Sequence, residues 1–475
     1  MPHTIQLRLI ATPLLLAMVL AGCASAPRLD SKSTPPVPAA FKETSGEWSA
    51  LPSSAVQPHG AWWKAFDDAA LDELIGRANR DNLTIQAAAA RLSQARALYQ
   101  HAEADRLPQL DAGAGTVRQE GANSPLSKIN KAGQLEPGEL GQATLNATYE
   151  VDIFGRQAGN ANATGLDAQS KAALLESTRL IVLTDVAQTY FALRAIDTER
   201  ALVRDTVQAY RATQSVTERL YREGEVAELD YSRIRAQVAE TEAQAFELDQ
   251  RRATLEHALA LLVGEAPADF KLDESAWNNV LPVIPAGVPS AVLVRRPDVL
   301  SAASELLAAQ ARVGVAKTAW FPTISLTANG GYASSELGNL FRWPARAWGV
   351  GALVDLPIFD GGRRNAGIQY ADAQASESLA RYRERVLTAF KDVEDQLSTL
   401  RILSSESDVQ AQAVAATSRA TVLSDSRYRN GLVSQLDLLE AQRSELSDRR
   451  LALQVRSQQF QSTIALIRAL GGGWS

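Results

Sequence analysis

The stretch YREGEVAELD, residues 221–230, recurs in altered form as YRNGLVSQLD at residues 428–437. Two more pairs of similar stretches occur in the same order along the chain: residues 82–113 with 296–327, and residues 152–156 with 357–363. Three matched pairs in one order indicate an internal duplication. The chain therefore consists mainly of two copies of one structural unit.

The bulk properties exclude several classes of protein. The chain has 475 residues, a net charge of −6 and a single cysteine, which cannot form an intramolecular disulfide. Nucleic-acid binding needs a basic surface, so the acidic balance argues against a nucleic-acid partner. No Gly-rich phosphate loop is present, and the four histidines are scattered: His3, His59, His101 and His257. We therefore expect no enzyme activity, no catalytic or metal-binding residue and no cofactor.

The amino terminus has the features of a secretion signal. Arg8 precedes the apolar run of residues 14–20, which is too short to cross a membrane as a helix. The motif LAGC follows and looks like a bacterial lipobox, in which Cys23 is acylated and becomes the first residue of the mature protein. We predict a signal peptide at residues 1–22 and a lipid anchor at Cys23. The alternative is an ordinary signal peptide with a chance cysteine.

The residues after the cysteine indicate the destination. Ala24, and not Asp, follows Cys23, and by the sorting of bacterial lipoproteins this points to the outer membrane. Residues 23–60 are rich in proline, serine and alanine, which is typical of an extended, lipidated tether. Each buried CH₂ group of an acyl chain contributes about 0.8 kcal/mol, so a triacylated cysteine would be a firm anchor.

Each copy contains a predicted β-hairpin. In the first copy, apolar Ala143, Leu145, Ala147, Tyr149 and Val151 alternate with polar Thr144, Asn146, Thr148, Glu150 and Asp152. Such alternation is typical of a strand with one apolar and one polar face. We place the hairpins at about residues 109–154, with a loop at 120–140, and at about residues 322–359. Strands of about ten residues have the length that a tilted membrane strand needs.

A long helix follows each hairpin. Apolar residues recur there at steps of three and four, which is coiled-coil spacing. The long helices are predicted at about residues 157–222 and about 363–430, and the first would be about 100 Å long at 1.5 Å per residue. Gly224 and Gly431 are helix stops at matching positions. Shorter helices are expected to begin near Glu228 and Gln435.

These elements predict an α+β membrane protein made of a duplicated helix–β-hairpin–long helix–helix repeat. The first repeat spans 61–264, an equatorial linker spans 265–295, and the second repeat spans 296–475. Four strands in lipid would leave two open edges, where unpaired backbone groups cost several kcal/mol each, so the sheet must close between chains. Two chains would give eight strands and no lumen, and three would give twelve. The strands by themselves do not fix the number of chains.

Five stretches resemble the TolC-like outer-membrane efflux factors, especially their lipidated OprM and NodT-type branch. They are residues 62–66 with Leu71 and Leu74, residues 149–156, residues 294–299, residues 356–363, and residues 428–431 with Leu436 and Asp437. The likeness covers essentially the whole mature chain. Each stretch is weak evidence alone, and their order makes the resemblance specific.

The resemblance implies a homotrimer with a 12-stranded β-barrel in the bacterial outer membrane, continuous with a long α-helical barrel in the periplasm. The implied partners are a periplasmic adaptor, or membrane fusion, protein and a proton-driven inner-membrane efflux pump, besides outer-membrane lipid. The implied function is that of a passive exit duct for small molecules such as drugs. The alternatives are a duct for polypeptide secretion and a periplasmic coiled-coil lipoprotein that forms no channel.

The resemblance also implies where the duct closes. In the family the two helical turns form the periplasmic tip on which the adaptor docks, and the matched residues are Tyr221, Arg222, Gly224, Tyr428, Arg429 and Gly431. Acidic side chains at the start of the last helix ring the aperture in the family, and here these are Asp437 and Glu440. The alternative is that Asp437 only favours the helix start through the helix dipole. Some relatives carry a locking arginine where this chain has Val433, which argues against such a lock here.

Overall fold

The computed structural model describes residues 33–43, 61–120, 126, 128–132, 134–275, 277, 279–282, 284, 292–293 and 295–472. The predicted signal peptide, the predicted anchor Cys23 and most of the predicted tether lie outside the described residues.

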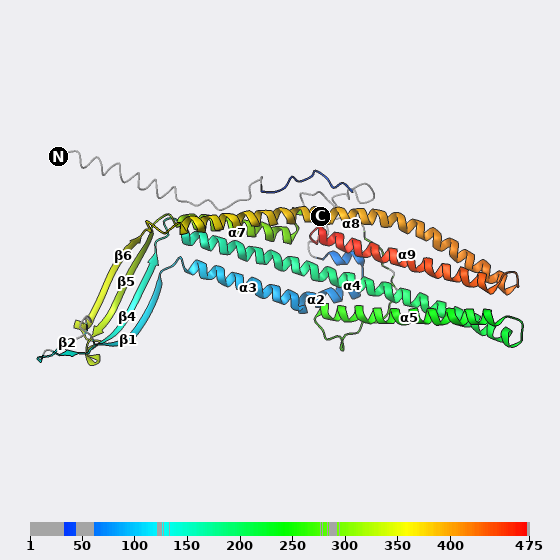
Figure 1. The fold of residues 1–475 in the computed structure, drawn as a ribbon, viewed down its shortest axis with the longest axis horizontal. Helices are drawn as coiled ribbons and strands as arrows, with labels where there is room; N and C mark the ends of the chain where they lie inside the picture. The colour runs from blue at the N-terminus through cyan, green and yellow to red at the C-terminus, as the bar shows by residue number, and fades with distance from the viewer. Residues whose placement is uncertain are drawn as a thin grey trace. The chain divides into compact units, whose positions relative to one another are not determined.

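The described helices and strands occur in two similar series. In chain order they are η1 (Trp62–Phe66), α2 (Ala69–Asp81), α3 (Leu83–Ala104), β1 (Gln109–Gln119), β2 (Lys128–Ile129), β3 (Leu135–Glu136), β4 (Gly138–Glu150), α4 (Arg156–Arg222) and α5 (Glu228–Val263), then α7 (Pro297–Thr318), β5 (Thr323–Ser334), η2 (Leu337–Asn339), η3 (Trp343–Ala345), β6 (Arg346–Asp355), α8 (Arg363–Arg429) and α9 (Gln435–Ala469). The long helices α4 and α8 have 67 residues each, and α5 and α9 have 36 and 35 (Figure 1). The two series agree with the predicted duplication.

The chain divides into two compact units that cut across the repeats. Apart from the amino terminus, the sheet unit contains Leu92–Lys171 and Ala302–Tyr382. The helical unit contains Thr34–Arg91, Ala172–Ser301 and Arg383–Ser475. Each repeat therefore gives its hairpin to one unit and its last helix to the other, and α4 and α8 contribute to both.

The sheet unit is built on a four-stranded antiparallel sheet in the order β1-β4-β5-β6. The hairpin of the first repeat is joined to that of the second through β4 and β5, which lie side by side in Figure 1. The segment predicted as a loop at 120–140 differs in part, because β2 pairs with β3 inside it and β4 already begins at Gly138. The side chain of Asn130 causes this local order, since its Oδ1 accepts from the backbone N–H of Ala132 at 3.0 Å and of Gln134 at 2.9 Å.

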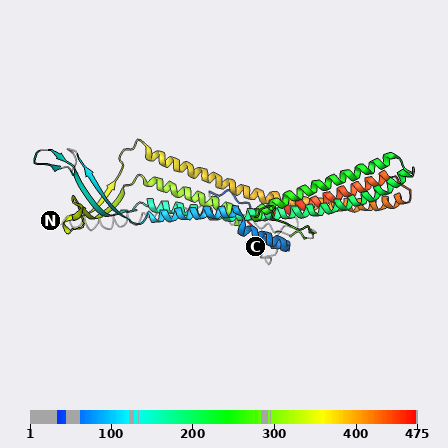
Figure 2. The same ribbon diagram turned by 90° about the horizontal axis from the view of Figure 1, so that it is seen from below.

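Part of the core of the helical unit lies between α4, α5 and α9. Tyr210 of α4, Ile234 and Val238 of α5 and Leu439 of α9 form one buried cluster. A second cluster joins Val203, Leu248 and Leu446 from the same three helices. The turn between α4 and α5 and the turn between α8 and α9 lie at the same end of this unit in both views (Figures 1 and 2). The three-and-four spacing of the apolar residues places them along this seam.

The linker between the repeats is packed into the helical unit by an aromatic cluster. Trp277 of the linker lies with its ring centroid 4.9 Å from that of Phe460 in α9. Phe460 also contacts Phe191 of α4, at 4.8 Å between ring centroids. Phe66 lies 5.0 Å from Phe191 and extends the cluster to the segment before α2. The buried rings thus join both repeats and the linker in one core.

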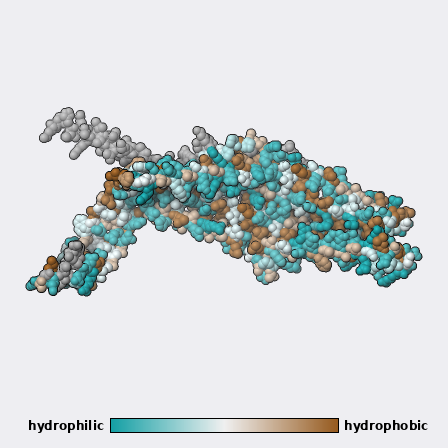
Figure 3. Space-filling model, in the orientation of Figure 1, coloured by the Kyte–Doolittle hydropathy of each residue, from teal (hydrophilic) through white to brown (hydrophobic). Residues whose placement is uncertain are grey.

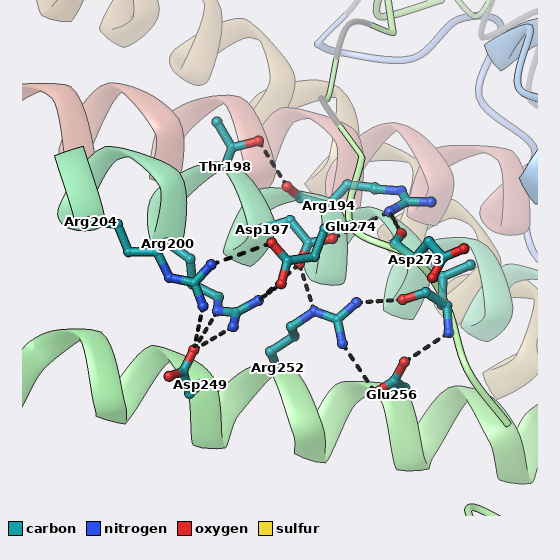
Figure 4. A network of polar contacts seen from close by, with 11 residues as sticks. Arg194, Asp197, Thr198, Arg200, Arg204, Asp249, Arg252, Glu256, Asp273 and Glu274 are labelled. Atoms are coloured by element: carbon teal, nitrogen blue, oxygen red, sulfur yellow. Dashed lines mark hydrogen bonds and ion pairs between the residues drawn. The ribbon is translucent and has the colours of Figure 1, made fainter. Parts of the chain in front are cut away.

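A buried charge network lies beside this core. The side chain of Asp197 in α4 is 3 % exposed and is surrounded by the guanidinium groups of Arg194, Arg200 and Arg252 (Figure 4). Arg252 Nε donates to Asp197 Oδ1 at 2.8 Å, and Arg194 Nη1 donates to Asp197 Oδ2 at 3.3 Å. One carboxylate therefore holds arginines from both α4 and α5.

The same network, through Arg194, Arg200 and Glu256, holds the start of the linker. Three bonds of about equal length fasten it: Arg194 Nη1 to Asp273 O at 2.7 Å, Arg200 Nη1 to Glu274 Oε1 at 2.7 Å, and the Leu272 N–H to Glu256 Oε1 at 2.8 Å. Figure 4 shows the backbone of the linker passing beside α4 and α5 at these side chains. The network therefore fixes the path by which the chain leaves the first repeat.

The exposed face of the helical unit is mainly hydrophilic, with scattered hydrophobic residues (Figure 3). This agrees with long helices that bury one apolar stripe and leave their other faces in water. Within the part of the chain that the structure describes, no helix combines the length and apolar character needed to span a membrane.

Candidate functional site

The register of the sheet separates its side chains into two chemically different faces. Leu110 pairs with Ala147, which pairs with Ala328, which pairs with Val350. The neighbouring row is Ala112, Leu145, Gly330 and Trp348. Directly paired residues lie on the same side of a pleated sheet. All four strands therefore give apolar residues to one face.

The opposite face of the sheet is polar. Gln109, Thr148 and Thr327 form one row across β1, β4 and β5, and Asp111, Asn146 and Asn329 form another. The predicted water-facing residues of β4, including Thr144 and Asn146, belong to this face. A sheet with one apolar and one polar face fits a wall between lipid and water.

The apolar face is open in a single chain. Trp348 is 78 % exposed and Val350 is 77 % exposed. The two outer strands, β1 and β6, each pair on one side only within the described residues. Edges of this length expose rows of unpaired N–H and C=O groups, which are costly in lipid. The wall is therefore complete only when further strands pair with both edges.

The two helical turns of the helical unit have the same backbone geometry. Gly224 has φ 79° and Gly431 has φ 73°. The Gly224 N–H donates to Tyr221 O at 3.0 Å and the Glu225 N–H donates to Leu220 O at 2.8 Å, while Gly431 and Leu432 donate to Tyr428 and Arg427 at 2.9 Å each. This is the Schellman ending of a helix, which needs a left-handed residue after the cap. The repeated glycines are therefore required by the turn.

Replacing Gly431 by alanine should lower the stability of the helical unit by about 1–2 kcal/mol, because an L-residue is strained in the left-handed region. Gly367→Ala, in the part of α8 that belongs to the sheet unit, is the control for a glycine in an ordinary helical position, since that position has no positive φ and no atom lies within 4 Å of an added Cβ. It should stabilise the helix by about 0.5–1 kcal/mol. Thermal unfolding followed by circular dichroism measures both, and shifts of the same sign would contradict this account.

The first turn also carries an aromatic pair that the sequence analysis missed. The ring of Tyr221 stacks on that of Tyr231 with centroids 5.4 Å apart and planes inclined by 8°. The guanidinium of Arg235 lies 5.7 Å from the centre of the Tyr231 ring. Arg222 forms an ion pair with Glu218 one helical turn earlier. The spacing of four residues between Tyr231 and Arg235 was a signal for this contact.

The second turn is simpler. Arg429 forms an ion pair with Asp425 at 2.9 Å, and both side chains are exposed. Tyr428 is partly buried, and Gly431 and Leu432 are exposed. The two predicted tips thus have the same backbone turn, and in each of them an arginine forms an ion pair with an acidic residue of its own helix.

Asp437 belongs to a capping box at the start of α9. The Asp437 N–H donates to Ser434 Oγ at 3.2 Å, and Asp437 Oδ2 accepts from the Ser434 N–H at 2.9 Å and from Ser434 Oγ at 2.6 Å. These bonds lower the pKa of the Asp437 carboxyl from 3.8. The helix-start role that the sequence analysis kept as an alternative is therefore real. The spacing Ser434-x-x-Asp437 was the signal for it.

Asp437 and Glu440 are both exposed, on the face of α9 opposite to its buried residues. Gln435, Leu438 and Leu439 are the buried residues of this helix start. The carboxylate of Asp437 can remain exposed while it caps the helix, so the cap does not exclude a second role for its charge. Val433 is partly buried.

Comparison with known proteins identifies the class. The sequence profile of the family "Outer membrane efflux protein" matches residues 74–265 and 288–472. The solvent efflux pump outer membrane protein SrpC of Pseudomonas putida is 32 % identical over 411 residues, which cover 86 % of this chain and 87 % of SrpC. The cation efflux system protein CusC of Escherichia coli is 28 % identical over 466 residues, 97 % of this chain and 98 % of CusC.

Solved structures show the same fold. The outer-membrane channel OprN superposes with a TM-score of 0.86 at 27 % identity, covering 95 % of this chain and 100 % of OprN. The MtrE outer membrane channel of Neisseria gonorrhoeae, in its open state, gives a TM-score of 0.80 at 26 % identity, covering 95 % and 98 %. The predicted duplicated repeat, with its four-stranded sheet in the described residues, is confirmed as the fold of these outer-membrane channels.

The chain belongs to the outer membrane efflux protein family. It is an outer-membrane channel component of an efflux system, as the resemblance predicted.

Proposed function

We propose that three copies of this chain pair β1 and β6 edge to edge and form a passive exit duct for small molecules. The supporting observation is the register of the sheet, which gives one apolar face, one polar face and, within the described residues, an unpaired edge at β1 and another at β6. Repeats 61–264 and 296–475, joined by the linker 265–295, each supply one hairpin. An inner-membrane pump supplies the energy, because the chain itself carries no nucleotide-binding motif.

The helical tips dock the partner proteins in this proposal. A periplasmic adaptor contacts the turns at Tyr221, Arg222 and Gly224 and at Tyr428, Arg429 and Gly431, residues that are exposed except for the partly buried Tyr428. Asp437 and Glu440 ring the aperture, and Cys23 carries the lipid anchor. The anchor lies outside the described residues, so mass spectrometry of the mature protein is its test.

The cargo is proposed to be small molecules, on the basis of the relatives. SrpC is named as a solvent efflux protein, TtgC of Pseudomonas putida as a toluene efflux protein, and CusC as a cation efflux protein. These names do not agree on one substrate, which fits a duct whose selectivity belongs to the pump. The polar side chains of the sheet are mainly amides and hydroxyls, with the carboxylate of Asp111 among them, and such groups are generic to many polar ligands.

A deletion strain tests this function. We expect it to become hypersensitive to members of a panel of antibiotics, organic solvents, dyes, detergents and metal salts, while its secreted proteins stay unchanged. Complementation by the wild-type chain should restore resistance. Normal sensitivity together with a missing secreted protein would replace the proposal by polypeptide export. ATP hydrolysis by the purified protein alone would contradict a passive duct.

A further inference from the structure

The start of α9 is attached to α4 by one buried hydrogen bond. Gln435 Nε2 donates to Thr217 Oγ1 at 2.9 Å, and these residues are 8 % and 1 % exposed. The hydroxyl of Thr217 donates in turn to Thr213 O at 3.0 Å. One hydroxyl therefore accepts from the last helix and donates to its own helix, and the bond joins the two repeats beside the helical tip.

The direction of this bond matters because of where the acidic residues lie. Successive residues of an α-helix are rotated by about 100°. Asp437 therefore lies about 200° around the axis from Gln435, and Glu440 lies about 140° from it. Both carboxylates are on the side of α9 opposite to the attachment. The rotation at which Gln435 meets Thr217 decides where the two acids point.

The other contacts of this helix start with α4 and α5 are apolar, and the next hydrogen bond to another helix, from Thr421 Oγ1 of α8 to Ala441 O at 3.1 Å, lies further along α9. Leu439 packs against Tyr210, Ile234 and Val238, and Leu438 is 1 % exposed. Apolar contacts are not directional and tolerate small rotations and shifts of a helix. A single buried polar contact can specify register where apolar packing does not. The Gln435–Thr217 bond is suited to that task.

We propose that Gln435 and Thr217 are positioning residues of the aperture, which hold the first turn of α9 at the rotation that directs Asp437 and Glu440 away from α4 and into the opening. The inference rests on the proposed role of these two acids in the duct. In this inference, a contact between the first and the second repeat determines where the two carboxylate charges lie.

The chemistry of the bond predicts unequal effects of its two partners. Thr217→Val removes the acceptor and leaves the buried amide of Gln435 without its partner, so the first turn of α9 must move to let the amide reach another one. Thr217→Ser keeps the hydroxyl. Gln435→Leu leaves the Thr217 hydroxyl bonded to Thr213 O, and the double variant Gln435→Leu with Thr217→Val makes the contact apolar on both sides.

The chain contains a matched control pair. Gln237 Nε2 donates to Thr241 Oγ1 at 3.2 Å, and Thr241 Oγ1 donates to Gln237 O at 2.8 Å. Both residues are buried, at 9 % and 0 % exposure. The groups are the same as in the proposed contact, but this pair lies within α5, and its side-chain hydrogen bonds among the described residues reach no other helix. Thr241→Val therefore controls for the loss of a buried threonine hydroxyl.

The test is the permeability ratio of K⁺ to Cl⁻, taken from the reversal potential of the purified, assembled full-length protein in planar bilayers under a KCl gradient. We expect Thr217→Val to lower this ratio at least twofold and Gln435→Leu to lower it less. The ratio of the double variant should lie nearer the wild-type value than that of Thr217→Val does. Thr217→Ser and Thr241→Val should match the wild type. An unchanged ratio in Thr217→Val and Gln435→Leu, or an equal fall in Thr241→Val, would overturn the inference.

The same recordings separate this inference from the function on which it rests. If the wild-type protein forms no channel, the proposed duct and the inference both fail. If Asp437→Asn lowers the ratio and Thr217→Val does not, the role of Asp437 in the aperture is supported and the positioning role of Thr217 is contradicted. If the Thr217→Val protein does not assemble, Gln435→Leu becomes the test. The permeability ratio of that variant must then fall below the wild-type value for the inference to hold.

Discussion

Replacing Asp197 by alanine should destabilise the helical unit by about 3–5 kcal/mol, the range for removing one partner of a buried ion pair. The carboxylate is 3 % exposed and faces Arg194, Arg200 and Arg252. Arg200 and Arg252 keep other carboxylate partners, Asp249 and Glu256. Arg194, with its side chain 5 % exposed, would keep the carbonyl oxygen of Asp273 and the ring of Tyr190. Most of the cost should come from the buried charge of Arg194.

The midpoint of thermal unfolding, followed by circular dichroism, measures the change. Glu242→Ala is the matched control, because the Arg211–Glu242 pair also joins α4 to α5 but its side chains are much more accessible, at 55 % and 33 % exposed. Exposed pairs contribute about 0–1 kcal/mol. Equal midpoints for the two variants would contradict the assignment of Asp197 as the centre of the network.

Trypsin adds a local readout. Lys271 is exposed and lies next to the linker residues that the network holds. Release of the linker in Asp197→Ala should speed cleavage after Lys271, whereas Glu242→Ala should not change it. Cleavage fragments of the same size, formed at the same rate in both variants, would show that the network does not hold the linker.

Replacing Asp437 and Glu440 together by alanine should raise the single-channel conductance by about twofold or more and reduce the preference for cations, since rings of charged side chains set the passage and selectivity of channels. The shortened side chains widen the opening, and the lost charge removes the attraction for cations. Planar-bilayer recordings of the assembled protein measure both quantities. Unchanged conductance would remove these two residues from the aperture.

Two further variants separate size, charge and capping in this experiment. Asp437→Asn with Glu440→Gln keeps the side-chain size, so cation preference should fall without the rise in conductance. Ser434→Ala removes the capping hydroxyl at a cost of about 1 kcal/mol and leaves both charges in place. A conductance in Ser434→Ala equal to that of the double alanine variant would trace the effect to the helix cap.

The pH dependence of the cation preference follows from Asp437. Its pKa is lowered from 3.8 by the bonds to Ser434. The folded-state pKa is thus below the unfolded value. The contribution of the charged cap to the free energy of unfolding is therefore present above the unfolded pKa and is lost as the pH falls through the folded-state pKa. Asp437 should therefore stay charged at about pH 5, and its part of the cation preference should persist there. A loss of preference above that pH would show that other groups carry it.

Much of the fold could be predicted because its causes are local. The bounds expected for the first long helix, 157–222, differ by one residue from α4, Arg156–Arg222. The turns at Gly224 and Gly431 were predicted from two glycines, since few other residues adopt a left-handed cap. The alternation along β4 likewise showed which residues share a face, because neighbouring side chains of a strand point to opposite sides.

Contacts between distant residues could not be predicted in this way. The pairing of β4 with β5, Asn146 opposite Asn329, decides that the polar residues of both hairpins line one face. A shift by one residue would have placed half of them on the other face, and nothing within either strand excludes that shift. The roles of Asp197 and Gln435 also depend on partners that other segments bring to them, Arg252 and Thr217. Periodicity, caps and turns act over a few neighbours and can be recognised in the chain itself, whereas register and buried polar pairing arise only when segments some fifty to two hundred residues apart pack together.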